Sequence, residues 1–180
     1  MITKGYLMEK GKFRWWKFIA LWVGFLLLHY SYKWFPNPVF FILSGESETV
    51  FLHMKMLFVD YVFINLVEFY LVRNRIQSKG SRLANRALIA VVYPWATITF
   101  WLLAWAFHIE FSIFWTIVYS NVTMLLGFYL ALRMEDLFEN IEFSSAIKWI
   151  ILMVFTAAVI VYVSFTLNPI YPFFTPPPGW

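Results

Sequence analysis

The sequence predicts an all-α polytopic membrane protein: a bundle of about five transmembrane helices with the N-terminus inside and the C-terminus outside. Hydrophobic residues make up 62% of the 180 residues and charged residues 13%, against roughly 45–50% and 25% in soluble domains. Five apolar runs are each long enough to cross a bilayer as a helix, which takes about 20 residues. The chain has no cysteine, which excludes a disulfide scaffold, thiolate metal sites and cysteine nucleophiles.

The five spans are expected near residues 15–34, 49–72, 87–107, 110–132 and 147–167. The first run is longer than the apolar core of a signal peptide and lacks a small-residue cleavage site, so it is expected to remain as a span. Pro94 lies inside the third run, where the missing backbone donor should bend the helix. Residues 1–180 then form a single integral membrane domain, because too little of the chain is left for a soluble one.

An acidic segment, Glu135 to Phe143, follows the fourth run and is expected to form a short amphipathic segment at the interface. Its carboxylates could bind a cation. They could equally form ion pairs with Arg82, Arg86 and Arg133 on the same side of the membrane, and this second interpretation is favoured.

The basic residues predict the orientation of the chain. Twelve of the 14 Lys and Arg residues fall on one side of the membrane in this arrangement; Lys33 lies on the other side and Lys55 within the second span. The positive-inside rule makes that side cytoplasmic. The net charge of +4 therefore requires no nucleic-acid partner. The basic residues are interpreted as solvated topology signals rather than as a site for anionic lipids.

The second span carries an unusual number of polar residues. Ionisable groups at membrane depth cost at least about 2.5–3.5 kcal/mol each, so they are expected to face the bundle interior, a cavity or a partner. His53, Asp60 and Glu68 fall on one side of the helix at about 100° per residue. These three residues could form a proton relay or structural hydrogen bonds between helices, and both interpretations remain. The candidate catalytic residues are Glu48, His53, Asp60 and Glu68, and the candidate pocket residues are Lys55, Asn65 and Asn121.

All three histidines fall in the outer half of the predicted bundle. His29, His53 and His108, with Glu110 beside the last, are therefore candidate ligands for zinc or iron. Their spacing is not diagnostic of a metal site, and hydrogen bonding at the interface is the favoured interpretation. No cofactor is indicated by the sequence.

The segments from His29 to Trp34 and from Ser47 to Met56, with Glu68 downstream, resemble a family of small bacterial and archaeal multi-pass membrane proteins of unknown function. Its signature at this place is Asn-Glu-Ser-x-Trp-Glu-His-x-Lys, and the matching positions here support Glu48, His53, Lys55 and Glu68. Ser47 and Leu52 depart from the signature, and Asp60 stands where proline is expected. The resemblance implies a prokaryotic cell membrane and a site at the outer start of the second span, but no activity.

Three functions are compatible with these features. The favoured one is a non-catalytic accessory or scaffold subunit that packs against other membrane-protein subunits and membrane lipids. The alternative is a membrane-embedded enzyme or binder that acts on a lipid-like molecule through His53, Glu48 and Asp60. The third, a proton- or ion-coupled transporter, lacks the repeated halves common in transporters. Whether the chain is an enzyme is left open.

Overall fold

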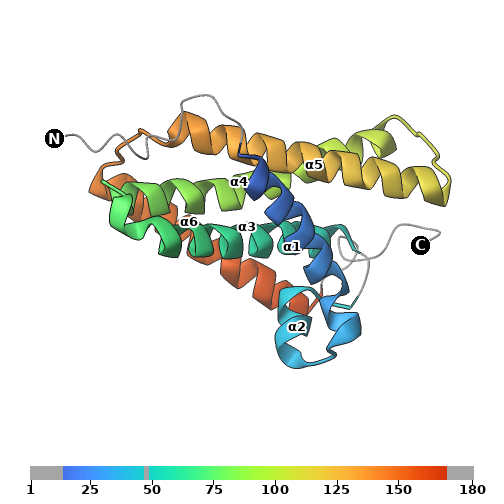
Figure 1. Cartoon of the computed structure of the whole chain (residues 1–180). Helices are drawn as coiled ribbons and strands as arrows, with labels where there is room; N and C mark the ends of the chain where they lie inside the picture. Colours follow the sequence, from blue (N-terminus) through green and yellow to red (C-terminus); the bar gives the residue numbers. More distant parts are fainter. Residues whose placement is uncertain (1–13, 47–48, 170–180) are drawn as a thin grey trace.

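The computed structural model describes residues 14–46 and 49–169, and this part of the chain is helical without strands. The five long helices are α1 (Trp15–Trp34), α3 (Val50–Val72), α4 (Lys79–Ala106), α5 (Ile113–Phe138) and α6 (Ser145–Leu167). Helix α4 packs on α3, α5 and α6, and α1 packs on α3 and α5. In Figure 1, α4 and α5 run side by side, whereas α1 and α6 cross α3 obliquely.

Four of these helices, α3 to α6, are long and apolar enough to cross a membrane. Helix α1, which carries Lys17 and Lys33, falls outside that set although it spans the residues expected of the first run. The all-helical architecture is therefore confirmed, and the four apolar helices are compatible with a multi-pass membrane protein. The fifth span and the orientation of the termini stay predictions.

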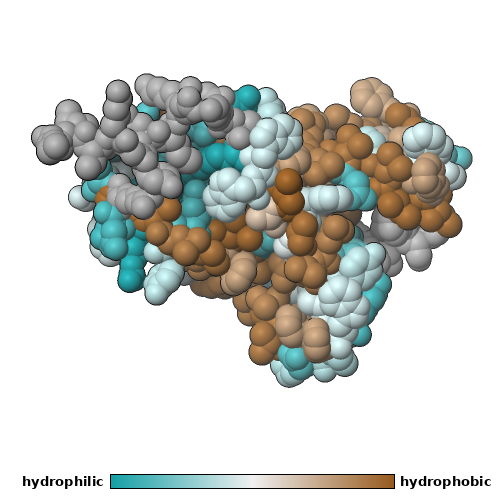
Figure 2. All heavy atoms as spheres, viewed as in Figure 1, coloured by the Kyte–Doolittle hydropathy of each residue, from teal (hydrophilic) through white to brown (hydrophobic). Residues whose placement is uncertain are grey.

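Apolar residues cover much of the surface seen in Figure 2. Many of the exposed large side chains belong to α5 and α6, among them Phe114, Trp115, Trp149 and Met153. Because a span normally faces hydrocarbon, such exposure agrees with a membrane protein.

Helix boundaries differ from the expected spans at two charged segments. Helix α4 begins at Lys79, well before the apolar run, and continues through Pro94. Helix α5 continues to Phe138, so the first acids of the acidic segment belong to its last turn and not to a separate interfacial helix. A span predicted from hydropathy stops at the first charged residues. The helix itself continues beyond them here, because those charges are paired inside the protein.

Two short elements were not expected from the sequence. Helix α2 (Pro38–Leu43) follows α1, and its N-cap Asn37 accepts hydrogen bonds from the Val39 and Phe40 amides. Such a cap satisfies amides that have no partner within the helix. A single 3₁₀ turn, η1 (Arg73–Arg75), follows α3.

Helix α3 is the centre of the bundle. Its Tyr61 and Phe58 are buried with Leu21 of α1, Tyr93 of α4 and Phe128 of α5. Two glycines allow close helix contacts: a Cβ at Gly24 would lie 2.1 Å from Asp60 Oδ1, and one at Gly127 would lie 2.0 Å from Thr97 Oγ1. Small residues serve such contacts between membrane helices.

The alternating helices give the bundle two distinct ends. We call the end that contains Arg14, Lys17, Arg82, Arg86 and Lys148 the basic end, and the opposite end, with His29, His53 and His108, the histidine end.

Candidate functional site

His53, Asp60 and Glu68 face α1 at three depths, as their spacing predicted. His53 lies against Phe25 and His29, Asp60 lies against Gly24, and Glu68 pairs with Lys17. A helix turns about 100° per residue, which brings positions seven apart to nearly the same face. The polar face of α3 is therefore the surface that packs on α1.

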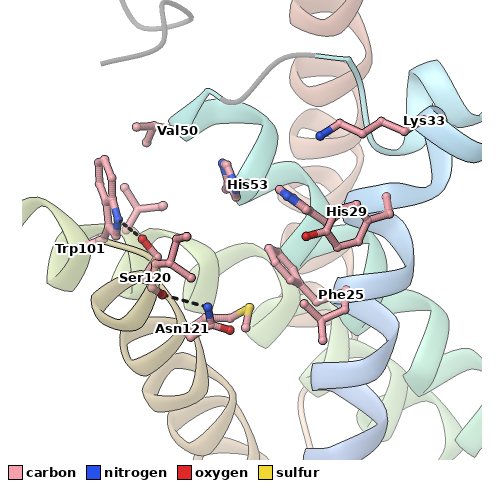
Figure 3. A pocket seen from close by; sticks show the side chains of 13 residues that line it. Phe25, His29, Lys33, Val50, His53, Trp101, Ser120 and Asn121 are labelled. Carbon is pink, nitrogen blue, oxygen red and sulfur yellow. Dashed lines mark hydrogen bonds between the residues drawn. The ribbon is translucent and has the colours of Figure 1, made fainter. Parts of the chain in front are cut away.

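A cavity of about 390 Å³ lies at the histidine end between α1, α3, α4 and α5. We call it the histidine pocket, and Figure 3 shows it. Its lining comprises Phe25, Leu26, His29, Tyr30 and Lys33 of α1, Val50 and His53 of α3, Ile98 and Trp101 of α4, and Ile117, Ser120, Asn121 and Met124 of α5. Three of the candidates named from the sequence, His29, His53 and Asn121, line this pocket.

The two histidines lie next to each other in the pocket (Figure 3), with ring centroids 5.4 Å apart. Phe25 stacks against both rings at centroid distances of 6.1 and 6.3 Å. His53 Nδ1 lies 2.8 Å from the Thr49 carbonyl oxygen. A carbonyl only accepts, so Nδ1 carries the proton in this contact and Nε2 is the acceptor nitrogen of a neutral ring.

The other polar groups of the pocket include an indole, an ammonium group, hydroxyls and the carboxamide of Asn121. Trp101 Nε1 donates to Ser120 Oγ at 3.0 Å, and Asn121 Nδ2 donates to the Ile117 carbonyl oxygen at 2.9 Å. The ammonium group of Lys33 lies 5.6 Å from the centre of the Tyr30 ring. Of the described residues, none that lines the pocket is acidic. The pocket thus combines an apolar floor with one cation, two imidazoles and an amide.

Asp60 lies outside the lining of the histidine pocket, beside Gly24. It is 1% exposed, and its Oδ2 has no hydrogen-bond partner within residues 14–46 and 49–169. Of the three residues proposed for a lipid-like molecule, the structure places His53 in the pocket and Asp60 apart from it, while Glu48 lies outside the described residues. That these three residues act together on one molecule stays a prediction.

The basic end contains a buried ion network centred on Lys17, whose side chain is 0% exposed. Its ammonium nitrogen lies 2.6 Å from Glu68 Oε2, 2.6 Å from Asn65 Oδ1 and 2.8 Å from Glu135 Oε1. The Tyr61 hydroxyl donates to the same Glu135 oxygen at 2.7 Å. This single lysine joins α1, α3 and α5.

Arginines extend the network to α4. Arg86 bridges Glu135 at 3.3 Å and Glu139 at 2.8 Å. Arg82 bridges Glu68 at 3.3 Å and Glu139 at 2.5 Å. Arg14, at the start of α1, lies 2.7 Å from Glu135 and 3.0 Å from Asp136. Within the described residues, these three arginines and Lys17 pair with the four acids Glu68, Glu135, Asp136 and Glu139.

The network confirms one prediction and corrects another. The acids pair with Arg82, Arg86 and Arg133, as expected, the last at 3.9 Å from Asp136. The interpretation of the basic residues as solvated topology signals is wrong for Arg14, Lys17 and Arg86, which are buried. The position of Lys17 within an apolar run was the sequence signal that indicated this burial.

The remaining candidates lie apart from the histidine pocket. Lys55 is buried and donates to Thr166 Oγ1 of α6 at 3.0 Å. Asn65 belongs to the ion network. His108 and Glu110 lie in the turn between α4 and α5, where His108 has a positive φ of 52°.

The histidines do not meet as one cluster. His29 and His53 line the pocket, whereas His108 is not part of its lining. Within residues 14–46 and 49–169, no group of three or more His, Asp or Glu side chains is placed to hold a metal ion. The structure therefore adds nothing to the proposed zinc or iron site beyond the pairing of two imidazoles.

Comparison with known proteins gives no relative: no family model, curated protein or solved structure matches the chain.

Proposed function

We propose that this multi-pass membrane protein binds an anionic amphipathic molecule in the histidine pocket. The observation that carries the proposal is the pocket itself. It brings Lys33, His29 and His53 together with Asn121 over an apolar floor. Its volume of about 390 Å³ falls within the roughly 300–1,000 Å³ of small-molecule sites, which join apolar walls to a few polar groups.

The arrangement of the pocket favours a carboxylate or phosphate as the polar group of the ligand. An ammonium ion and amide or imidazole N–H groups form charge-assisted hydrogen bonds with such anions. Phe25, Ile98 and Met124 provide apolar contacts for a hydrocarbon portion. His53, with an acceptor nitrogen at Nε2, could also take a proton from a bound acid. The resemblance that supports His53 points to the same region.

The test measures binding of cis-parinaric acid, a fluorescent fatty acid, to the purified protein in neutral detergent. Dodecyl phosphate is expected to displace it and dodecanol is expected to compete poorly. Lys33→Gln should weaken binding by about fivefold, because an ion pair near a surface contributes roughly 1 kcal/mol. His53→Gln should weaken binding as well, because it removes the Nε2 acceptor that takes the proton of a bound acid.

The matched control is Lys79→Gln, which removes one exposed positive charge outside the pocket. It should leave the affinity unchanged. Equal affinity for dodecanol and dodecyl phosphate, or equal loss in all three variants, would overturn the proposal.

A second candidate is the accessory or scaffold subunit that the sequence favoured. It is supported by the low burial of α6. Of its most apolar 18-residue stretch, 17% is buried inside the protein, against 56% for the corresponding stretch of α3. Partner helices or lipid could cover this surface. Native mass spectrometry of the chain, extracted gently from its own membrane, tests this candidate. Stoichiometric protein subunits support it, and an isolated chain that carries only lipid contradicts it.

A further inference from the structure

A second cavity lies at the basic end, between α3, α4 and α6, with a volume of about 510 Å³. We call it the basic-end groove. It shares no lining residue with the histidine pocket. Leu66 and Phe69 of α3, Leu83 of α4, and Leu152 and Phe155 of α6 form much of its wall. The groove is therefore a separate and mainly apolar site, long enough to contact several turns of α6.

Three basic residues, Arg82, Arg86 and Lys148, line this groove, and none of the other described residues that line it is acidic. Lys148 lies in the first turn of α6 near Gly80 of α4: a Cβ at Gly80 would lie 3.6 Å from its ammonium nitrogen. The four acids of the ion network pair with other cations. Within the described residues, Lys148 forms no ion pair.

Arg86 adds a second, independent observation. It is buried, at 5% exposure, yet its Nε and Nη1 have no hydrogen-bond partner within the described residues. Only its Nη2 contacts Glu135 and Glu139. A buried guanidinium with unused donors costs free energy unless another acceptor reaches it. The donors available around the groove thus exceed the acceptors.

Trp149 follows Lys148 in the sequence and also lines the groove, and it is 65% exposed. Tryptophan at the end of a transmembrane helix typically lies at the level of the lipid headgroups. With Trp149 at that level, the basic part of the groove would lie at headgroup depth and its apolar part at acyl-chain depth. An amphipathic occupant would meet both parts at once.

We propose that the basic-end groove binds one anionic phospholipid, with its phosphate near Lys148 and one acyl chain along α6. Basic pockets between transmembrane helices bind anionic headgroups in this way. The choice of occupant follows from charge complementarity. A neutral lipid would leave the positive charge of Lys148 uncompensated, and an apolar partner helix would offer no acceptor to Lys148 or to Nε and Nη1 of Arg86.

The test uses the full chain in neutral detergent with equal amounts of phosphatidylglycerol and phosphatidylcholine carrying the same acyl chains. Native mass spectrometry then counts the lipids that stay bound as the activation energy rises. The wild type should retain one phosphatidylglycerol in preference to phosphatidylcholine. Lys148→Ala should lower this preference by about fivefold, the contribution of one basic residue near a membrane surface.

The matched control is Arg133→Ala, which removes an exposed positive charge from α5 at the same end, outside the groove. It should keep the preference for phosphatidylglycerol, and Lys148→Arg should keep it as well. Equal retention of both lipids by the wild type overturns the proposal. An equal loss of the phosphatidylglycerol preference in Lys148→Ala and Arg133→Ala overturns it too. A protein subunit found bound in the groove at a fixed stoichiometry also overturns it. Variants of the histidine pocket should not change this readout, so this inference and the proposed function fail independently.

Discussion

Replacement of Lys17 by methionine tests how the buried ion network stabilises the bundle. Methionine keeps most of the length and the apolar stem of the side chain but removes the charge and three donors. In the wild type these donors reach Glu68, Glu135 and Asn65 at 2.6 to 2.9 Å, and the lysine side chain is 0% exposed. The variant therefore leaves the network with an excess negative charge out of reach of water.

Removal of one partner from a buried pair costs about 3–5 kcal/mol. Glu135 retains Arg14, Arg86 and Tyr61 in the variant, and Glu68 retains Arg82. The lower part of that range, about 3 kcal/mol, is therefore expected for Lys17→Met. The double variant Lys17→Met with Glu68→Gln restores charge balance, so it should be more stable than the sum of the two single changes, by roughly 1–3 kcal/mol.

Unfolding in sodium dodecyl sulfate, followed by circular dichroism, measures these differences. Arg133→Ala is the control, because it removes a positive charge from an exposed pair at the same end, and its unfolding midpoint should stay unchanged. A Lys17→Met midpoint equal to that of the wild type would refute the reasoning. If the stability losses of the two single variants add up to the loss of the double variant, charge balance does not govern the network.

Two further predictions concern helix packing and topology. Gly127→Ala should destabilise the protein by about 1–3 kcal/mol in the same assay, as overpacking does, because the added Cβ would lie 2.0 Å from Thr97 Oγ1. A second change, Thr97→Ala, should restore part of the lost stability. Absence of this rescue would contradict the contact. The chain has no cysteine, so Lys79→Cys and Glu110→Cys each give a single thiol for labelling by an impermeant maleimide. The positive-inside rule predicts that intact cells are labelled only at Glu110→Cys, and the opposite pattern would reverse the proposed orientation.

Much of the fold follows from hydropathy and spacing along the chain. The apolar runs predicted the long helices, and residues 15–34 match α1 as expected. Helical periodicity placed His53, Asp60 and Glu68 on one face because a helix repeats its direction every 3.6 residues. The ion pairs of the acidic segment with Arg82 and Arg86 were predictable as well, since their helices end or begin at the same side of the membrane.

The candidate sites depended on contacts between distant segments. The sequence identified His53 and Asn121 as polar residues in apolar runs, but only the packing of α1, α3, α4 and α5 places them around one cavity and leaves Asp60 outside it. The basic-end groove likewise needs α3, α4 and α6 together. A cavity is the space between packed helices, and a local sequence pattern does not predict how distant helices pack.

The sequence by itself determined that this is a helical, multi-pass membrane protein, because burial of apolar side chains in a bilayer depends on composition along each helix. Only the tertiary structure decided that Lys17 and Arg14 are buried and that α4 and α5 extend beyond their apolar runs. The physical reason is charge pairing. The cost of burying a charge depends on its partners, and here those partners come from helices 48 or more residues away in the chain.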